Sequence, residues 1–411
     1  MATTTLTAAD AALKEVYLPS ITDQLENEIK TLRRVEKTSE NVTNDSVGGK
    51  YVRFATRMKR NHGIGARLEN EVLPIPRTQQ YADGQVKLTS QYGAIELTGQ
   101  VFELATSNSQ AFASILDQEV SGITEGVAKD INRQVYGSPA GLLATAVTGS
   151  TTTLVTTNAD VIWLEIGMFV DVFDVSAAGF MAGGPFEITN IQRGTPGAGQ
   201  ATVTITVSGT AIAVGDTFHR PGSRNKETEG FASIVLGSGV LHNINPATFP
   251  NWTSEVDSPG AQSITEGRMI AMIDRINARG GKTSVIFTAK GVRRAYFALL
   301  QQQRQFVNTQ KFEGGFTGLA FTTDDGDVPL VSDNDCPNGT MWFMNEERLK
   351  MFHAGNWDWM NRDGSRWRLV VDPTASTGGD VDAYRARLYR YLQIGTTQRN
   401  SHGVIKQIIE A

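Results

Sequence analysis

The chain has 411 residues, which exceeds the usual size of one domain and predicts two or three compact units. Its composition is 40% hydrophobic and 20% charged, which is ordinary for a globular protein and excludes wholesale disorder. The formal net charge of -5 argues against a dedicated nucleic-acid-binding protein, which would carry a strongly basic surface. A single cysteine, Cys336, excludes an internal disulfide framework and a multi-cysteine zinc site. No secretory signal pattern and no apolar run near ~20 residues is visible, so we expect a soluble protein made in a reducing cytoplasm, with no membrane partner.

Residues 1–49 predict an N-terminal arm. Apolar residues recur near helical spacing over residues 9–36, although Pro19 must break or begin a helix. The following segment, Thr38 to Gly49, is polar and rich in turn residues.

Residues 50–104 predict a long two-stranded β-arm. A strand-like run from Lys50 to Arg57 leads into a basic tip that contains glycines, and the chain returns from Thr78 to Leu104 with approximate period-2 alternation. Because a two-stranded ribbon alone is marginally stable in water, such an arm is either disordered or held by another subunit. Charged residues at the tip are candidate intersubunit contacts, since both signs of charge could pair with a neighbour. A solvated loop would need no explanation, but the long unsupported strands beneath the tip favour the intersubunit contact. These candidates are Lys59, Arg60, Arg67, Glu69 and Glu71.

Residues 105–139 contain the strongest helix prediction, from about Ser107 to Tyr136. Ser107 can cap this helix, an apolar stripe follows its 3.6-residue period, and Gly137 ends it. We expect Gly122 and Gly126 to let a neighbouring backbone approach closely.

Residues 140–225 are rich in Thr, Val and Gly and poor in Lys, which predicts a small all-β module, either a barrel or a sandwich of five or six strands. The predicted strands are Thr152–Thr156, Met168–Asp174, Phe186–Ile191, Ala201–Val207 and Asp216–Arg220.

Residues 226–346 alternate between helix and strand, which predicts a central sheet flanked by helices. Ser263-Ile264-Thr265-Glu266 has the pattern of a capping box and opens a helix that ends at Gly280-Gly281. The residues expected to face inward from this helix are Met269, Ile270, Met272, Ile273 and Ile276. The other elements expected here are the strand Ser284–Thr288, a helix from Lys290 to about Gln303, and the strands Val328–Val331 and Thr340–Asn345.

Residues 347–411 predict a return to β-structure. A long strand around Tyr384 to Ile394 has one partly basic face, and Val404–Ile409 supplies a last strand.

No motif for catalysis or cofactor binding is present in the sequence. Asp324 to Asp327, with Asp333 and Asp335, resembles a cation site but lacks the register of an EF-hand loop, so a solvated hairpin tip is favoured. A set of tryptophans could stack on sugars or bases, although packing or an interface is favoured. These tryptophans are Trp342, Trp357, Trp359 and Trp367. We therefore expect no catalytic residue, no cofactor and no metal site.

The order of these elements resembles the major capsid protein of tailed bacteriophages, the Hong Kong 97 fold. The resemblance rests on Lys50–Leu104, Ser107–Tyr136 and Ser263–Asp335, and it covers nearly the whole chain except residues 140–225. It implies an α+β fold with a small all-β insertion domain. The implied parts are an N-terminal arm (1–49), an extended loop (50–104), the spine helix of the peripheral domain (105–139), the inserted β-barrel or sandwich (140–225), an axial α/β domain (226–346) and the return strands of the peripheral domain (347–411).

The resemblance implies a non-enzymatic structural subunit that assembles as hexamers and pentamers into an icosahedral shell around double-stranded DNA. The extended loop of one subunit would lie across its neighbour, and the DNA would be contacted loosely and without sequence preference. Portal, scaffolding and decoration proteins are the other implied partners, with assembly in the host bacterial cytoplasm and a final place in the virion. Some members form a lysine–asparagine cross-link. Lys59 lies in the corresponding loop, but no asparagine partner is identifiable, so we expect none.

Two other interpretations remain open at this stage. The same fold serves encapsulin-like bacterial nanocompartments, which the inserted module and the long N-terminal arm disfavour. A β-rich carbohydrate-active protein could use the tryptophans and paired acids, and it would be a monomer or small oligomer. A negative-stain image of the purified protein distinguishes the capsid from the carbohydrate-active protein, because a closed shell excludes the latter.

Overall fold

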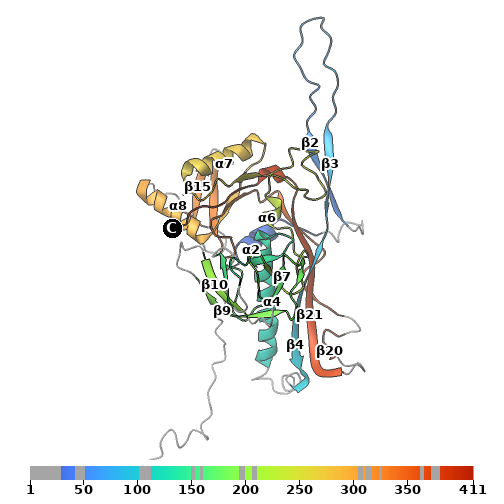
Figure 1. Ribbon diagram of the computed structural model, residues 1–411. Helices are drawn as coiled ribbons and strands as arrows, with labels where there is room; N and C mark the ends of the chain where they lie inside the picture. Colours follow the sequence, from blue (N-terminus) through green and yellow to red (C-terminus); the bar gives the residue numbers. More distant parts are fainter. Residues whose placement is uncertain are drawn as a thin grey trace, which may run out of the picture.

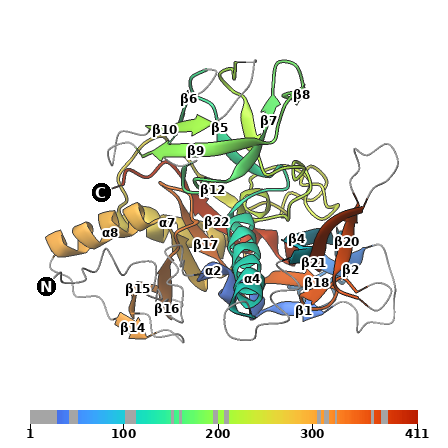
Figure 2. The same cartoon turned by 90° about the horizontal axis from the view of Figure 1, so that it is seen from below.

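The computed structural model describes residues 29–41, 51–100, 113–149, 153–157, 161–193, 200–205, 211–303, 309–311, 317–323, 326–361, 365–371 and 380–410. Helix α4 (Ala113–Tyr136) lies at the centre, with a β-sheet on each of three sides and a two-stranded arm that projects from the body (Figures 1 and 2). None of the described helices is both long and apolar enough to cross a membrane.

The arm consists of β2 (Val52–Lys59) and β3 (Gln80–Val86), which pair antiparallel. Exposure alternates along β2, in agreement with the period-2 pattern of its sequence. The connecting loop lies at the far end of the arm, away from the body (Figure 1).

The returning strand corrects one expectation for the arm. β4 (Thr89–Thr98) does not extend the ribbon, because it pairs with the long strand β21 (Asp380–Thr396) over ten residues. β21 also joins the other strands of a six-stranded sheet, which we call the long-strand sheet. Its other members are β1 (Ser39–Asn41), β18 (Leu349–His353), β19 (Asp358–Trp359) and β20 (Arg368–Val371).

Helix α4 packs against the long-strand sheet at Gly93 of β4, where a Cβ atom would press on Val127 and Ile123. The helix ends at Tyr136, followed by Gly137, as the sequence predicts. Its predicted start, including Ser107, lies outside the described residues. The expectation for Gly122 and Gly126 is wrong within the described chain, because no described atom lies within 4 Å of a Cβ built on either residue.

The second sheet contains strands from residues 142–219, and we call it the β-module. All five strands predicted in this region are present, with shifted ends, and β5 (Leu142–Thr145) and β8 (Gly179–Phe180) were not predicted. The five are β6 (Thr153–Thr157), β7 (Phe169–Asp174), β9 (Phe186–Gln192), β10 (Gln200–Ile205) and β11 (Thr217–His219). The β-module has an apolar core of its own, built from side chains such as Val172, Ile188 and Phe218.

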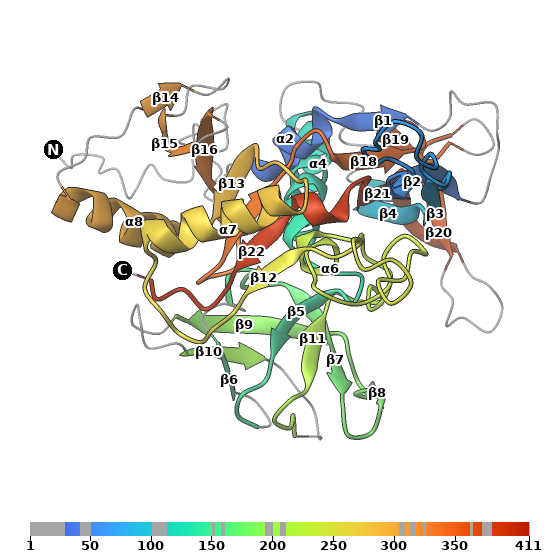
Figure 3. The same ribbon diagram turned by 90° about the horizontal axis from the view of Figure 1, so that it is seen from above.

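The third sheet is mixed, since β13 (Val285–Thr288) runs parallel to β16 (Gly326–Ser332) and antiparallel to β17 (Met341–Met344). We call it the mixed sheet. Its other strands are β12 (Glu255–Asp257), β14 (Thr309–Lys311), β15 (Thr317–Thr323) and β22 (Gly403–Ile405). Helices α7 (Glu266–Ala278) and α8 (Lys290–Gln303) lie on the side of α4 opposite the long-strand sheet (Figure 3).

Helix α7 differs from its prediction in two details. Thr265, rather than Ser263, caps the helix, because Thr265 is extended and its hydroxyl accepts a hydrogen bond from the backbone N–H of Arg268 at 3.3 Å. Ile270 is about half exposed instead of facing inward, whereas the other four predicted apolar residues are buried.

A single main core joins α4, the mixed sheet and the long-strand sheet. The ring of Phe231, in the short helix α6 (Phe231–Ile234), contacts Tyr136 of α4 and both Phe287 and Trp342 of the mixed sheet, with centroid distances of 5.3 to 5.8 Å. Buried aromatic contacts of this kind tie the end of α4 to the mixed sheet.

Candidate functional site

The base of the arm is anchored to the body of its own subunit. Phe54 of β2 lies 5.9 Å from His242 and 6.4 Å from Trp252, measured between ring centroids. The backbone N–H of Gln85 donates to the carbonyl of His242 at 2.8 Å, and Thr56 donates to a carbonyl near the end of β21. The expectation of an arm with almost nothing of its own to pack against is therefore wrong for the base.

Glycine is required where the arm crosses this anchor. Gly84 of β3 is paired with Phe54, and a Cβ atom at Gly84 would overlap the phenyl ring. The absence of a side chain lets the ring lie flat across the ribbon and reach the core.

The loop at the end of the arm is exposed along almost its whole length between Lys59 and Gln80. Its apolar side chains face solvent, with Ile64 83% and Val72 86% exposed. Leu68, Leu73 and Ile75 are similarly exposed. Such a group of exposed apolar residues is typical of an interaction surface.

Two of the five candidate residues shape the loop itself. Arg67 donates from Nε to the carbonyl of Val72 and from Nη1 to the carbonyl of Ala66, both at 2.8 Å. Glu71 accepts from the backbone N–H of Leu68 at 3.0 Å. These contacts close a turn, so the two charged groups are already engaged within their own chain.

The other three candidates, Lys59, Arg60 and Glu69, are exposed. None of the three forms a side-chain hydrogen bond or an ion pair with another described residue. Their charges therefore remain available to a partner, in contrast to those of Arg67 and Glu71.

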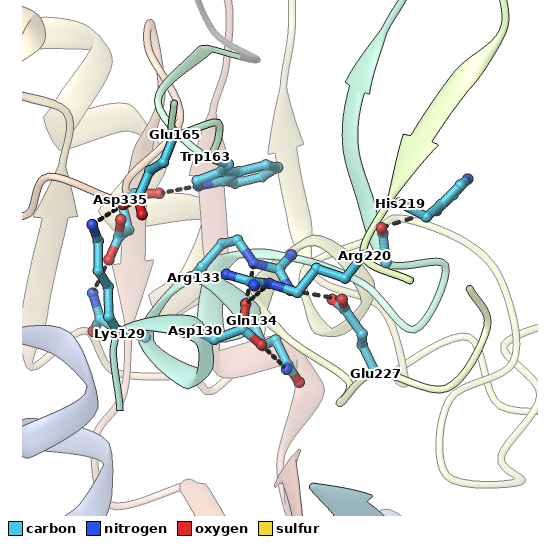
Figure 4. Close-up of polar contacts among 12 residues, drawn as sticks. Lys129, Asp130, Arg133, Gln134, Trp163, Glu165, His219, Arg220, Glu227 and Asp335 are labelled. Carbon is cyan, nitrogen blue, oxygen red and sulfur yellow. Dashed lines mark hydrogen bonds and ion pairs between the residues drawn. The ribbon is translucent and has the colours of Figure 1, made fainter. Parts of the chain in front are cut away.

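The sequence analysis did not identify a buried ion-pair network between α4 and the β-module (Figure 4). Arg133 of α4 donates to Asp130 at 2.9 Å and to Glu227 at 2.6 Å, and Arg220 also donates to Asp130 at 2.6 Å. Burial alone would raise the pKa of Asp130, but Arg133 and Arg220 outweigh it and lower that pKa to about 2. Burial raises the pKa of Glu227, against the opposing effect of Arg133.

This network ties the last turns of α4 to the segment that follows β11 of the β-module. Residues 131–137 are all buried, so the polar groups there need partners within the protein. Among the described atoms, one nitrogen of Arg133 and one oxygen of Glu227 have no hydrogen-bond partner. Removing Arg133 would leave the buried carboxylate of Glu227 without its ion-pair partner, whereas removing Glu227 would leave Arg133 paired with Asp130 alone.

A second buried polar cluster joins α2 (Thr31–Glu36) to α4 and the mixed sheet. Asp333 accepts hydrogen bonds from the backbone N–H of Thr31 at 3.0 Å and from its hydroxyl at 2.6 Å. Asn132 of α4 donates to Asp335 at 2.5 Å and accepts from the N–H of Leu32 at 2.9 Å. Burial raises the pKa of Asp335 to about 6, although the hydrogen bond from Asn132 opposes this.

This cluster contains two of the acidic residues that resemble a cation site in the sequence. Asp333 and Asp335 are buried structural acids, whereas Asp324 and Asp325 lie outside the described residues. Within the described parts of the chain, no group of three or more His, Cys, Asp or Glu side chains has an arrangement that could hold a metal ion.

The tryptophans also have structural positions. Trp342 is buried in the main core, and Trp357 packs against that core with the guanidinium of Arg390 6.0 Å from its ring. The prediction of packing is confirmed for these two residues, and burial leaves Trp342 unavailable for stacking on a sugar.

Comparisons with known proteins give a family for most of the chain and a similar fold over its whole length. The family model of the SU10 major capsid protein matches residues 105–384. A solved structure described as the cyanophage A-1(L) capsid asymmetric unit has a TM-score of 0.60 and 12% identity, over 99% of this chain and 100% of that chain. No curated protein sequence matches this chain.

Two further solved structures are more distant. A chain from Mycobacterium phage Bobi has a TM-score of 0.47 and 10% identity, over 98% of this chain and 99% of that chain. The SrpI encapsulin of Synechococcus elongatus has a TM-score of 0.43 and 8% identity, over 100% of this chain and 97% of that chain. At 12% identity, the likeness to the cyanophage capsid chain concerns the fold. It confirms the predicted α+β fold of the phage capsid type.

Proposed function

The chain belongs to the SU10 major capsid protein family, and we propose that its copies assemble as hexamers and pentamers into an icosahedral shell around double-stranded DNA. Its function is that of a structural subunit of a bacteriophage capsid, which places the protein in the virion. A capsid subunit is not a class of enzyme.

The observation that carries the proposed assembly is the contrast between the two ends of the arm. The base is fixed to its own core through Phe54, whereas the loop beyond Lys59 exposes apolar side chains to solvent. Burying apolar surface contributes about 25 cal/mol per Å², so covering this loop with a neighbouring subunit would favour assembly. We propose that this loop is the extended loop of the family and lies across the adjacent copy.

The charged residues of the loop have two proposed roles. Lys59, Arg60 and Glu69 would contact the neighbour directly, because their charges are free within the described chain. Arg67 and Glu71 would act indirectly, because they hold the turn that presents the loop. An Arg67 variant therefore cannot test an intersubunit contact cleanly, whereas an Arg60 variant can.

We propose Arg60→Glu as the test, with Lys87→Glu as the matched control. Both residues are exposed and both changes reverse one charge, but Lys87 lies at the body end of the arm. We expect the unassembled subunits to melt like the wild type in both variants, since neither removes an internal contact. Shell yield and shell melting temperature, measured by electron microscopy and calorimetry, should fall only for Arg60→Glu. Normal shells from Arg60→Glu would contradict this role.

The remaining partners are proposals that rest on the family alone. We propose as partners a portal protein, scaffolding and decoration proteins, and loosely bound DNA, with assembly in the host bacterial cytoplasm. We also propose the six-part division of the chain, in which the β-module is the inserted domain and a candidate site for a decoration protein. The net charge of -5 fits a DNA container, because strong phosphate binding would hinder packing and ejection.

A further inference from the structure

A pocket lined by four arginines lies at one end of the long-strand sheet. Its volume is ≈ 260 Å³, and its other lining residues are Met360, Leu369 and Val370. The four arginines are Arg366, Arg368, Arg385 and Arg387, and we call this site the arginine pocket. It lies beside β20 and the start of β21, at the end of the molecule opposite the tip of the arm (Figure 1).

The arginine pocket concentrates positive charge in a chain whose net charge is negative. Arg368 is directly opposite Arg385 in the β20–β21 pairing, and Arg387 follows Arg385 on the same face of β21. Like charges opposite each other on neighbouring strands are destabilising. Glu96 of β4 offsets part of this, since it accepts from two nitrogens of Arg385 at 2.5 and 2.8 Å.

Two of the four guanidinium groups, those of Arg366 and Arg387, are not neutralised by any carboxylate among the described residues. Arg366 and Arg387 are exposed, and neither forms a side-chain hydrogen bond or an ion pair with another described residue. Guanidinium groups bind carboxylate and phosphate through paired N–H donors, so the pocket has the chemistry to receive an anionic group. The apolar side chains of Leu369 and Met360 offer contact to the carbon atoms that carry that group.

The tip of the arm has the complementary chemistry. The turn from Leu68 to Val72 presents Glu69, which has no partner among the described residues, between two exposed apolar side chains. The turn is preformed, because Glu71 accepts from the N–H of Leu68 and Asn70 adopts the left-handed conformation with φ 70°. A preformed turn loses little conformational entropy on binding.

We infer that the arginine pocket of one copy receives the acidic turn Leu68–Val72 of a second copy, with Glu69 bound by the guanidinium groups of Arg387 and Arg366. The tip and the pocket lie at opposite ends of the molecule, so they cannot meet within one chain (Figure 1). A contact between two different surfaces of identical copies is heterologous, and it generates closed rings when the rotation closes. This inference rests on the proposed assembly and identifies the receptor site for the loop.

A charge-swap cycle in the full-length protein tests the inference. The variants are Glu69→Arg, Arg387→Glu and the double variant, with Arg366→Glu in place of Arg387→Glu if that subunit does not fold. The control combines Glu69→Arg with Arg348→Glu, because Arg348 is also exposed but lies away from the pocket. Subunit folding is checked by thermal melting, and association is measured by sedimentation and electron microscopy.

We expect each single variant to weaken association about tenfold, as for the loss of one charge-assisted hydrogen bond. The double variant should recover most of this loss, and the control pair should not. If wild-type shells form and every variant forms them equally well, the contact is wrong while the capsid function stands. If wild-type protein forms no shell at all, the proposed assembly itself fails. Normal association of Arg387→Glu with a reduced DNA content of the shells would overturn the contact in favour of a nucleic-acid backbone.

Discussion

The two carboxyl groups of Asp333 and Asp335 lie together in the buried cluster beneath α2, and the variant Asp335→Asn tests their energetic role. Burial raises the pKa of Asp335 from 3.8 to about 6. An asparagine has nearly the same shape and can keep an oxygen within reach of Asn132, which donates to Asp335 in the wild type. The substitution therefore removes the titration of this group with little change in packing.

The sign and size of the effect follow from the direction of the shift. The pKa of Asp335 is higher in the folded protein than in the unfolded chain, so protonation of this group favours folding. This stabilisation is complete below pH 3.8 and is lost as the pH rises through about 6. A shift of about two pKa units corresponds to about 3 kcal/mol in the free energy of unfolding.

The measurement is urea denaturation of the unassembled subunit from pH 4 to pH 8. We expect the free energy of unfolding of Asp335→Asn, relative to the wild type, to rise across this range by an amount approaching 3 kcal/mol. Asp174→Asn is the control, because the hydroxyl of Ser176 lowers the pKa of the exposed Asp174 from 3.8, so both folded and unfolded forms stay largely ionised and the relative free energy of unfolding should change little across this range. A difference between Asp335→Asn and the wild type that does not vary with pH would refute this account of the cluster.

Two further pairs of substitutions test the anchor of the arm and the ion-pair network at the end of α4. Gly84→Ala should lower stability by about 1 to 3 kcal/mol, because the new Cβ would overlap the ring of Phe54. The matched change Gly122→Ala should raise stability by up to about 1 kcal/mol, since that Cβ meets open space and alanine favours the helix. Glu227→Ala should cost about 2 to 3 kcal/mol by removing one of the two buried carboxylate partners of Arg133, whereas Glu165→Ala, in a partly exposed pair, should cost less than about 1 kcal/mol. The free energy of unfolding of each variant is measured by thermal and urea denaturation. Equal changes for a variant and its matched control would contradict the prediction for that pair.

The elements that the sequence predicted well are those with a local signal. Helix α4 ends at Tyr136 because Gly137 follows it directly and Pro139 comes two residues later, and α8 has the predicted bounds of Lys290 and Gln303. Strand β8, with only two residues, has no periodicity to detect. The position of β4 was missed for a different reason, since its hydrogen-bonding partner β21 is almost three hundred residues away. Period-2 alternation identifies a strand but not the strand with which it pairs.

The difference between local signals and contacts of distant segments also explains which site residues could be predicted. Sequence reasoning placed five charged residues at the tip of the arm. It had no means to separate Arg60, whose side chain has no partner among the described residues, from Arg67, which holds the turn. The buried polar clusters were missed because their members come from distant segments. Asn132 and Asp335, for example, are separated by 203 residues. A signal did exist, namely the run of polar residues near the end of the apolar stripe of α4.

The arrangement of the arm bears on the order of folding and assembly. If the whole ribbon depended on a neighbour, an isolated subunit would have to order both strands at the moment of association, at about 1 to 2 kcal/mol per residue. The anchor of Phe54 in the subunit's own core removes most of this cost before any neighbour is met. What association must then order is the loop beyond Lys59, part of which is already held by Arg67 and Glu71. The original argument that a ribbon without a core needs a partner therefore applies to the tip alone, and a folded, soluble subunit with an unsatisfied tip is the species that should enter assembly.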